Sequence, residues 1–139
     1  MKRLFVTAII FTFIVSLTSI SYGFSLFISP SSYKATVAPG LSVTGDARIT
    51  NEGNYPIGIK TDAQDWIYNE QGSKTFLPPG TNPFSCAKWI RLFPSKFKVE
   101  ANSYRTTQFT INAPEDAEGG YYAVVFFESF VCWNIKFII

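Results

Sequence analysis

Apolar and polar residues alternate with a period of two along most of this chain, a pattern typical of half-buried β-strands. The clearest case covers residues 43–50, with Val43, Ala47 and Ile49 on one parity and Thr44, Asp46, Arg48 and Thr50 on the other. No stretch of the sequence repeats its apolar residues at the i, i+3, i+4, i+7 spacing of an amphipathic helix. The pattern therefore predicts an all-β fold.

Turn-forming residues divide the chain into about seven short strands, at intervals of roughly 8–12 residues. Turns are predicted at Asn51–Asn54 and Asn69–Ser73, and the three prolines within Pro78–Ser85 exclude a helix there. The expected strands are 24–29 with 33–38 (interrupted at Pro30), 43–50, 57–64, 75–77, 87–93, 96–100, 104–111 and 121–127. Short strands at this spacing indicate a β-sandwich, with a barrel as the weaker alternative.

The stretch Tyr121–Phe127 is apolar on both parities and follows the flexible pair Gly119–Gly120. A strand in the middle of a sheet, with both faces covered, carries such a run. The alternative is a membrane helix from residue 121 onward, which would have to bury Glu128 and Lys136 at roughly 2.5–3.5 kcal/mol for each charge. We therefore predict a central strand.

The last ten residues, 130–139, form a further candidate strand. Its apolar positions are Val131, Trp133, Ile135, Phe137 and Ile139, and they alternate with Cys132, Asn134 and Lys136. An unpaired strand with apolar residues at alternate positions is an aggregation hazard, so we expect it to bind another strand. The chain stops on hydrophobic residues, which leaves two interpretations: a minimal last strand, or a domain truncated at its C-terminal end.

The N-terminus has the layout of a secretory signal peptide. Lys2 and Arg3 precede the apolar stretch Leu4–Leu17, and small residues fit a cut after Gly23. An uncleaved anchor is the alternative, but the apolar stretch is shorter than the ~20 residues of a spanning helix. We expect a signal peptide at 1–23, one domain at 24–139, a periplasmic or extracellular location, and no stable membrane span after signal removal.

Charge and residue types argue against catalysis and nucleic-acid binding. Removal of Lys2 and Arg3 leaves ten basic against ten acidic residues, so no strongly basic face is available for nucleic acid. The chain has no histidine, which excludes Ser-His-Asp and Cys-His arrangements. We expect no enzyme activity and no cofactor. Calcium binding by carboxylates is a minor alternative to solvated turns; the carboxylates are Asp62 with Asp65, and Glu115, Asp116 and Glu118.

Two cysteines and several aromatic residues have structural interpretations. Export would allow Cys86 and Cys132 to form a disulfide, but two free, buried thiols are the favoured alternative. The large aromatic residues are expected to fill the core rather than to form a ligand platform: Trp66, Trp89, Phe97 and Phe109.

Four stretches in order resemble the immunoglobulin-like N-terminal domain of the PapD-like periplasmic pilus-chaperone superfamily. They are ISPSSYKATVAPG, DARITNEGNYPIGIKTDAQDWIYNEQG, WIRLFPSKFKVEANSYRTTQFTI and APEDAEGGYYAVVFFES. The likeness covers roughly residues 25–129. It implies an immunoglobulin-like (PapD-like) β-sandwich that binds partner subunits by β-strand addition. It also implies a basic pair that anchors a partner's carboxylate, for which Lys34 and Lys136 are the weak candidates.

Two functional readings follow. The first is an exported, chaperone-like module whose partners are protein subunits or envelope proteins, bound through the first strand or through Val131, Trp133, Ile135 and Phe137. The second is a structural domain of a cell-surface or envelope protein of the adhesin type, without chaperone activity.

Overall fold

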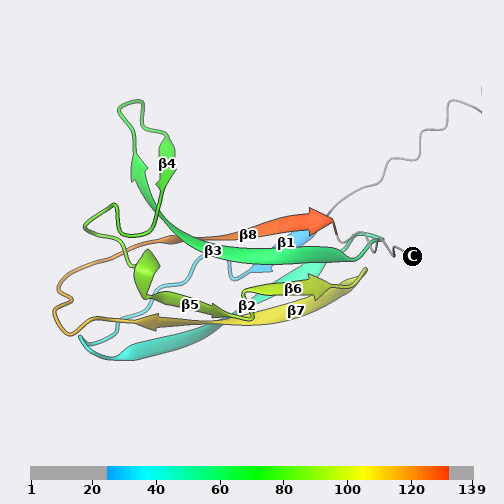
Figure 1. The fold of residues 1–139 in the computed structure, drawn as a ribbon, viewed down its shortest axis with the longest axis horizontal. Helices are drawn as coiled ribbons and strands as arrows, with labels where there is room; N and C mark the ends of the chain where they lie inside the picture. Colours follow the sequence, from blue (N-terminus) through cyan, green and yellow to red (C-terminus); the bar gives the residue numbers. More distant parts are fainter. Residues whose placement is uncertain (1–24, 132–139) are drawn as a thin grey trace, which may run out of the picture.

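The computed structural model describes residues 25–131 and confirms the all-β prediction (Figure 1). Two β-sheets lie face to face, and the hairpin that contains β4 projects from the body of the sandwich. The strands are β1 (Leu26–Ser29), β2 (Ser42–Asn51), β3 (Ile57–Tyr68), β4 (Lys74–Leu77), β5 (Ile90–Phe93), β6 (Lys96–Val99), β7 (Ser103–Asn112) and β8 (Val124–Val131). A single 3₁₀ turn, η1 (Ala87–Trp89), precedes β5.

The order of the strands is that of an immunoglobulin-type sandwich. One sheet has the order β1-β2-β7-β5, and the other pairs β3 with β8 on one edge and with β6 and β4 on the other. β5 and β6 are two halves of one extended segment that changes sheets at Pro94. With this segment counted once, the first sheet is A-B-E-D and the second contains C and F. The immunoglobulin-like fold class is thus confirmed.

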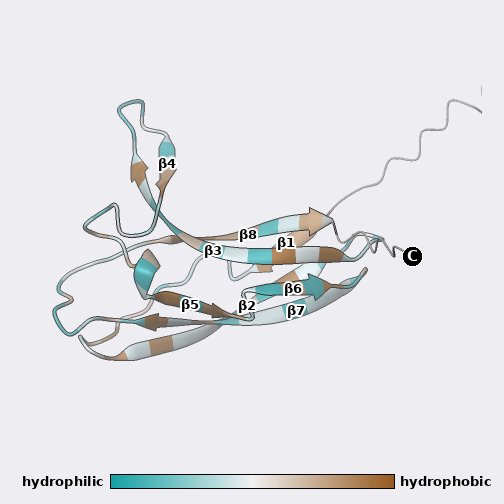
Figure 2. Ribbon diagram, viewed as in Figure 1, coloured by the Kyte–Doolittle hydropathy of each residue, from teal (hydrophilic) through white to brown (hydrophobic). Residues whose placement is uncertain are grey.

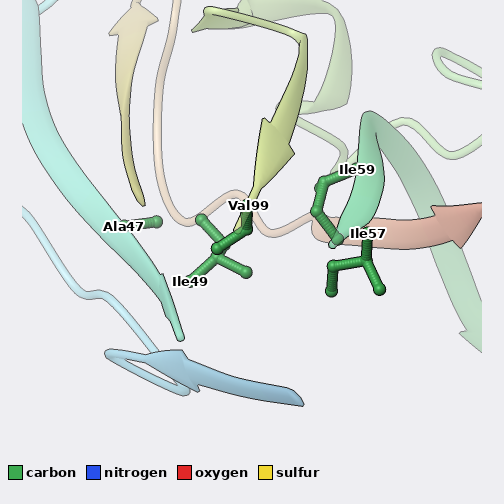
Figure 3. Close-up of a cluster of buried hydrophobic side chains, with 5 residues drawn as sticks. All are labelled: Ala47, Ile49, Ile57, Ile59 and Val99. Atoms are coloured by element: carbon green, nitrogen blue, oxygen red, sulfur yellow. The ribbon is translucent and has the colours of Figure 1, made fainter. Parts of the chain in front are cut away.

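Five apolar side chains from three strands form the buried core (Figure 3). They are Ala47 and Ile49 of β2, Ile57 and Ile59 of β3, and Val99 of β6. They share one parity on their strands, because alternate side chains point to opposite faces of a sheet. Partly buried Leu26, Phe97, Phe109 and Phe127 pack against this cluster. The expected inward faces of β2 and β3 are therefore confirmed.

Away from this cluster the sandwich is packed less closely. The inward residues Val43, Ile90, Leu92 and Ile111 are half-buried rather than buried. Leu41, just before β2, is 60% exposed. The apolar core is therefore concentrated at the end of the sandwich where β2 stops and β3 begins.

Several boundaries differ from the sequence-based predictions. β8 begins at Val124, because Tyr121–Ala123 form only an isolated bridge beside residues 84–86. Among the described residues β8 pairs with β3 alone, and Val124–Phe127 are half-buried, so the central strand with two covered faces is not what this part of the chain shows. Residues 33–38 form no strand, and residues 87–89 form η1 instead of extending β5.

The remaining strand ends and loops lie where the sequence predicts them. β2 ends at Asn51 as expected, β4 is a four-residue strand, and residues 78–85 form a loop. The expected signal peptide (1–23) lies outside the described residues. Within residues 25–131 there is no helix with the length and apolarity to cross a bilayer.

Candidate functional site

One backbone edge of β8 faces no other strand in the described part of the chain. The orientation of this edge follows from a hydrogen bond on the far side of β3, where the Thr61 N–H donates to the Ser95 carbonyl at 2.8 Å. The Thr61 amide therefore points away from β8, and Phe127 opposite it lies in a non-hydrogen-bonded pair. By the same alternation, the N–H and C=O groups of Val125, Phe127 and Ser129 point out to the free edge.

The interior behind this edge is incompletely covered. Phe127 and Ser129 share the inner face with Thr61 and Ile59, their cross-strand partners. Even so, Ser129 is exposed and Phe127 is half-buried. On the edge strand of the other sheet, Ile28 points inward beside Ile49 yet remains 37% exposed. Within residues 25–131, both edges thus combine backbone that faces no further strand with partly exposed apolar side chains, the pattern that accepts an added strand.

The binding-edge residues predicted from the sequence fall partly outside this region. Val131 is the last residue of β8 and lies opposite Ile57. Trp133, Ile135 and Phe137 lie outside the described residues. The alternative edge, the first strand, is limited to Leu26–Ser29.

The weak candidates for an anchor and a disulfide have one described member each. Lys34 is exposed in a segment without regular secondary structure after β1, and Lys136 lies outside the described residues. Cys86 is half-buried just before η1, and its candidate partner Cys132 also lies outside the described residues. Burial raises the pKa of the Cys86 thiol, so the protonated form is favoured.

The sequence indicated Asp65 only as a candidate calcium ligand and did not predict its structural role, which is to bind a loop. This side chain is fully buried on β3 and holds the proline-rich loop. One oxygen accepts the backbone N–H groups of Thr81 and Asn82 at 2.7 and 2.8 Å, and the other accepts the Ser85 hydroxyl. The sequence did contain a signal, because Asp65 has the same parity as the inward residues Ile57, Ile59 and Ala63 and follows Ala63 by two positions.

These hydrogen bonds set the ionisation of Asp65. Burial by itself raises the pKa of the carboxyl group. The hydrogen bonds from Asn82, Ser85, Gly80 and Thr81 outweigh it, so the pKa lies below its ordinary value of 3.8. Asp65 is therefore a charged structural latch at neutral pH.

The carboxylates considered for calcium have other surroundings. The Asp65 oxygens are taken by the loop, and Asp62 accepts a hydrogen bond from the Gln64 amide at 2.9 Å. Glu115, Asp116 and Glu118 lie in the turn before β8. Across residues 25–131, no three acidic or sulfur ligands gather as a cation would require.

The aromatic residues divide into two groups. Phe97 and Phe109 pack against the core cluster, as predicted. Trp66 is half-buried outside that cluster, with its ring 5.0 Å from the ring of Tyr122 and with the Lys74 ammonium 4.5 Å from its centroid. The contacts of Trp66 support the projecting hairpin rather than an open ligand platform.

Comparison with known proteins yields matches among solved structures. No family model and no curated protein matches the sequence. Among solved structures, the chain is similar to the ASH / PapD-like domain of human CEP192 (PapD-like domain 7), with 15% sequence identity and a TM-score of 0.43. The match covers 70% of this chain and 72% of that one. We assign the fold from the strand order alone.

Proposed function

We propose that this protein is an exported, non-enzymatic binding module that holds a partner protein by adding a strand to the free edge of β8. Its resemblance to pilus-chaperone domains makes a subunit of a surface assembly the expected class of partner. The signal-like segment Met1–Gly23 supports export. The absence of histidine supports a role in binding rather than catalysis.

The observation that carries the proposal is the orientation of the β8 backbone. Three successive outward positions, Val125, Phe127 and Ser129, offer N–H and C=O groups to the free edge in the described structure. A strand added there gains main-chain hydrogen bonds, and its alternate side chains can cover Phe127 and Ile28. Each net hydrogen bond contributes about 1 kcal/mol, so specificity would come mainly from the side chains that enter between the sheets.

Ser129→Pro tests the proposal by removing a single backbone N–H group. The Ser129 N–H points away from β3, so proline removes a donor from the free edge without removing a β3–β8 hydrogen bond. Ser129→Ala is the matched control because it keeps the N–H and removes a similar amount of side chain. Both variants are made in the full chain, and each is checked for folding by its melting temperature.

The readout is the capture of partner proteins from periplasmic extract, compared between the two variants. We expect Ser129→Ala to capture the same proteins as the native chain and Ser129→Pro to lose most of them. Equal capture by two folded variants would show that the β8 edge is not the binding edge. The triple variant Val131→Ser, Trp133→Ser and Ile135→Ser then tests the tail separately.

A further inference from the structure

On its other side, β3 has a gap in its pairing that the β8 edge does not explain. β6 pairs with Ile57–Lys60, and β4 pairs with Asp65–Tyr68. Thr61 bonds to Ser95, which ends the contact with the β6 segment. Between the two partners, Asp62–Gln64 pair only with β8 among the described strands.

The backbone of Ala63 faces this gap. Thr61 directs its N–H toward β6, and Asp65 pairs with Leu77 of β4 on the same side. Alternation places the N–H and C=O groups of Ala63 on that side as well. Neither the β4 ladder nor the β6 ladder reaches Ala63, and no loop hydrogen bond of residues 25–131 reaches it. Unpaired backbone groups beside an apolar interior are rare in folded proteins, because each one left without a partner is costly.

A second unpaired backbone position faces the same space from the other sheet. The Ile90 N–H donates to the Ala87 carbonyl rather than to β7, so the amide of Ile90 points to the free edge of β5. Leu92 has the same parity, and its N–H and C=O groups therefore also point away from β7. Among the described strands β5 pairs with β7 alone, and no loop hydrogen bond of this part of the chain reaches Leu92.

Ala63 and Leu92 both line one open cavity of about 490 Å³ between the edges of β3 and β5. Ala87 and Ile90 add to its apolar wall, and β5 is coloured hydrophobic over most of its length in Figure 2. The cavity thus offers two unpaired edges, one from each sheet, with an apolar surface between them.

The charged residues at this cavity are mainly basic. Lys88 and Arg91 line it, are exposed, and form no ion pair with a described residue. The one acidic residue that lines it, Asp62, has an oxygen occupied by Gln64. An anionic ligand therefore matches the charge of the cavity better than a cationic one.

We propose that this cavity is a second binding site, separate from the β8 edge, which takes an extended, acidic peptide segment of a partner protein. The segment lies between β3 and β5, exchanges main-chain hydrogen bonds with Ala63 on one side and with Leu92 on the other, and places acidic side chains near Lys88 and Arg91. Backbone pairing fixes its extended conformation, since both walls are strand edges. The two basic residues select its charge.

The test uses a blocked octapeptide of alternating aspartate and valine, titrated into the ¹⁵N-labelled full chain. We expect the amide resonances of Ala63 and Leu92 to shift together with saturable binding. A peptide with lysine in place of aspartate is expected to bind at least about tenfold more weakly, because both contacts become repulsive. Two further acidic peptides carry N-methyl groups, one on its odd residues and one on its even residues. At least one of the two is expected to lose binding, because N-methylation removes the N–H groups that bond to a strand edge.

Charge reversal supplies the matched variants. Lys88→Glu with Arg91→Glu is expected to weaken the acidic peptide by at least about tenfold. Arg105→Glu, an exposed charge outside the cavity, is expected to leave its affinity unchanged. Unchanged affinity in the double variant, or no binding at about 1 mM peptide, would overturn the proposal. Shifts confined to Val125, Phe127 and Ser129 would also overturn it, while supporting strand addition at β8.

Discussion

At the end of the sandwich around Ile59, five apolar side chains are buried together. Around Asp65, six residues further along the same strand, the fully buried group is a carboxylate. One strand therefore passes from a region held by apolar burial to a region held by hydrogen bonds to a charge. The first contribution depends little on pH, and the second depends on the ionisation of one group.

Each region also has a polar side chain that ties a turn to the sheets. Asn51 is fully buried beside the core, donates to the Tyr55 carbonyl at 2.7 Å and to the Glu100 carbonyl at 3.1 Å, and accepts the Gly53 N–H. Asp65 holds the proline-rich loop in the same way, and it lies outside the buried apolar cluster. Asn51 is neutral at every pH, so the comparison isolates the effect of charge.

The largest expected effect is the loss of apolar burial at Ile59. Ile59→Ala is expected to lower the free energy of unfolding by about 3 kcal/mol, because Ile59 is fully buried in the cluster. Ile90→Ala, at the half-buried end, is expected to cost only about 1 kcal/mol. Urea denaturation of both variants measures the difference. Equal losses would show that the core is not concentrated around Ile59.

The next effect is the removal of the charge at Asp65. Asp65→Asn keeps the shape of the side chain but replaces an acceptor oxygen with a donor group, which opposes the N–H groups of Thr81 and Asn82. We expect a loss of about 2 kcal/mol in the free energy of unfolding. Asp62→Asn, which is half-buried and accepts one side-chain hydrogen bond, is the matched control and is expected to change it by much less. An unchanged free energy of unfolding in Asp65→Asn would contradict the stabilising role of the Asp65 carboxylate.

Acid should weaken the Asp65 region before it weakens the Ile59 region. The pKa of Asp65 is lower in the folded chain than its ordinary value of 3.8. The stabilisation is therefore fully present above that value and is lost as pH falls through the lower, folded pKa. In Asp65→Asn, the loss of stability at low pH that comes from protonation of Asp65 should be missing. Melting temperatures of the two proteins between pH 7 and pH 2 would measure it, and parallel curves would refute it.

The sequence was sufficient for the strands that alternate, and insufficient where pairing decides. β2 and β7 could be predicted because an inward residue at every second position leaves one register for the buried face. The prediction for the run Tyr121–Phe127 is wrong because apolar residues on both parities indicate two covered faces, whereas its first three residues serve as a connection and the strand starts at Val124. Composition does not distinguish a covered face from a free edge.

The candidate sites depended even more on contacts between distant segments. The Asp65 latch joins β3 to a loop about twenty residues later, and no local pattern encodes that meeting. The unpaired backbone of Ala63 results from β6 and β4 stopping short of each other along β3. Ala63 has a small apolar side chain like many other strand residues, so the sequence does not indicate that its backbone is unpaired.

The smallest expected effect concerns the charged pair that joins β3 to β8. Lys60 and Glu128 lie opposite each other with 3.9 Å between Nζ and Oε2, and their side chains are 59% and 57% exposed. Water screens such a pair, so Glu128→Gln is expected to lower the free energy of unfolding by less than about 1 kcal/mol. Urea denaturation at low and high salt measures it, and a larger, salt-insensitive loss would contradict the assignment. If the small value holds, β8 is kept on β3 by its backbone ladder and by Phe127 against the core. The strand addition proposed at the outer edge of β8 would then leave the Ile59 region undisturbed.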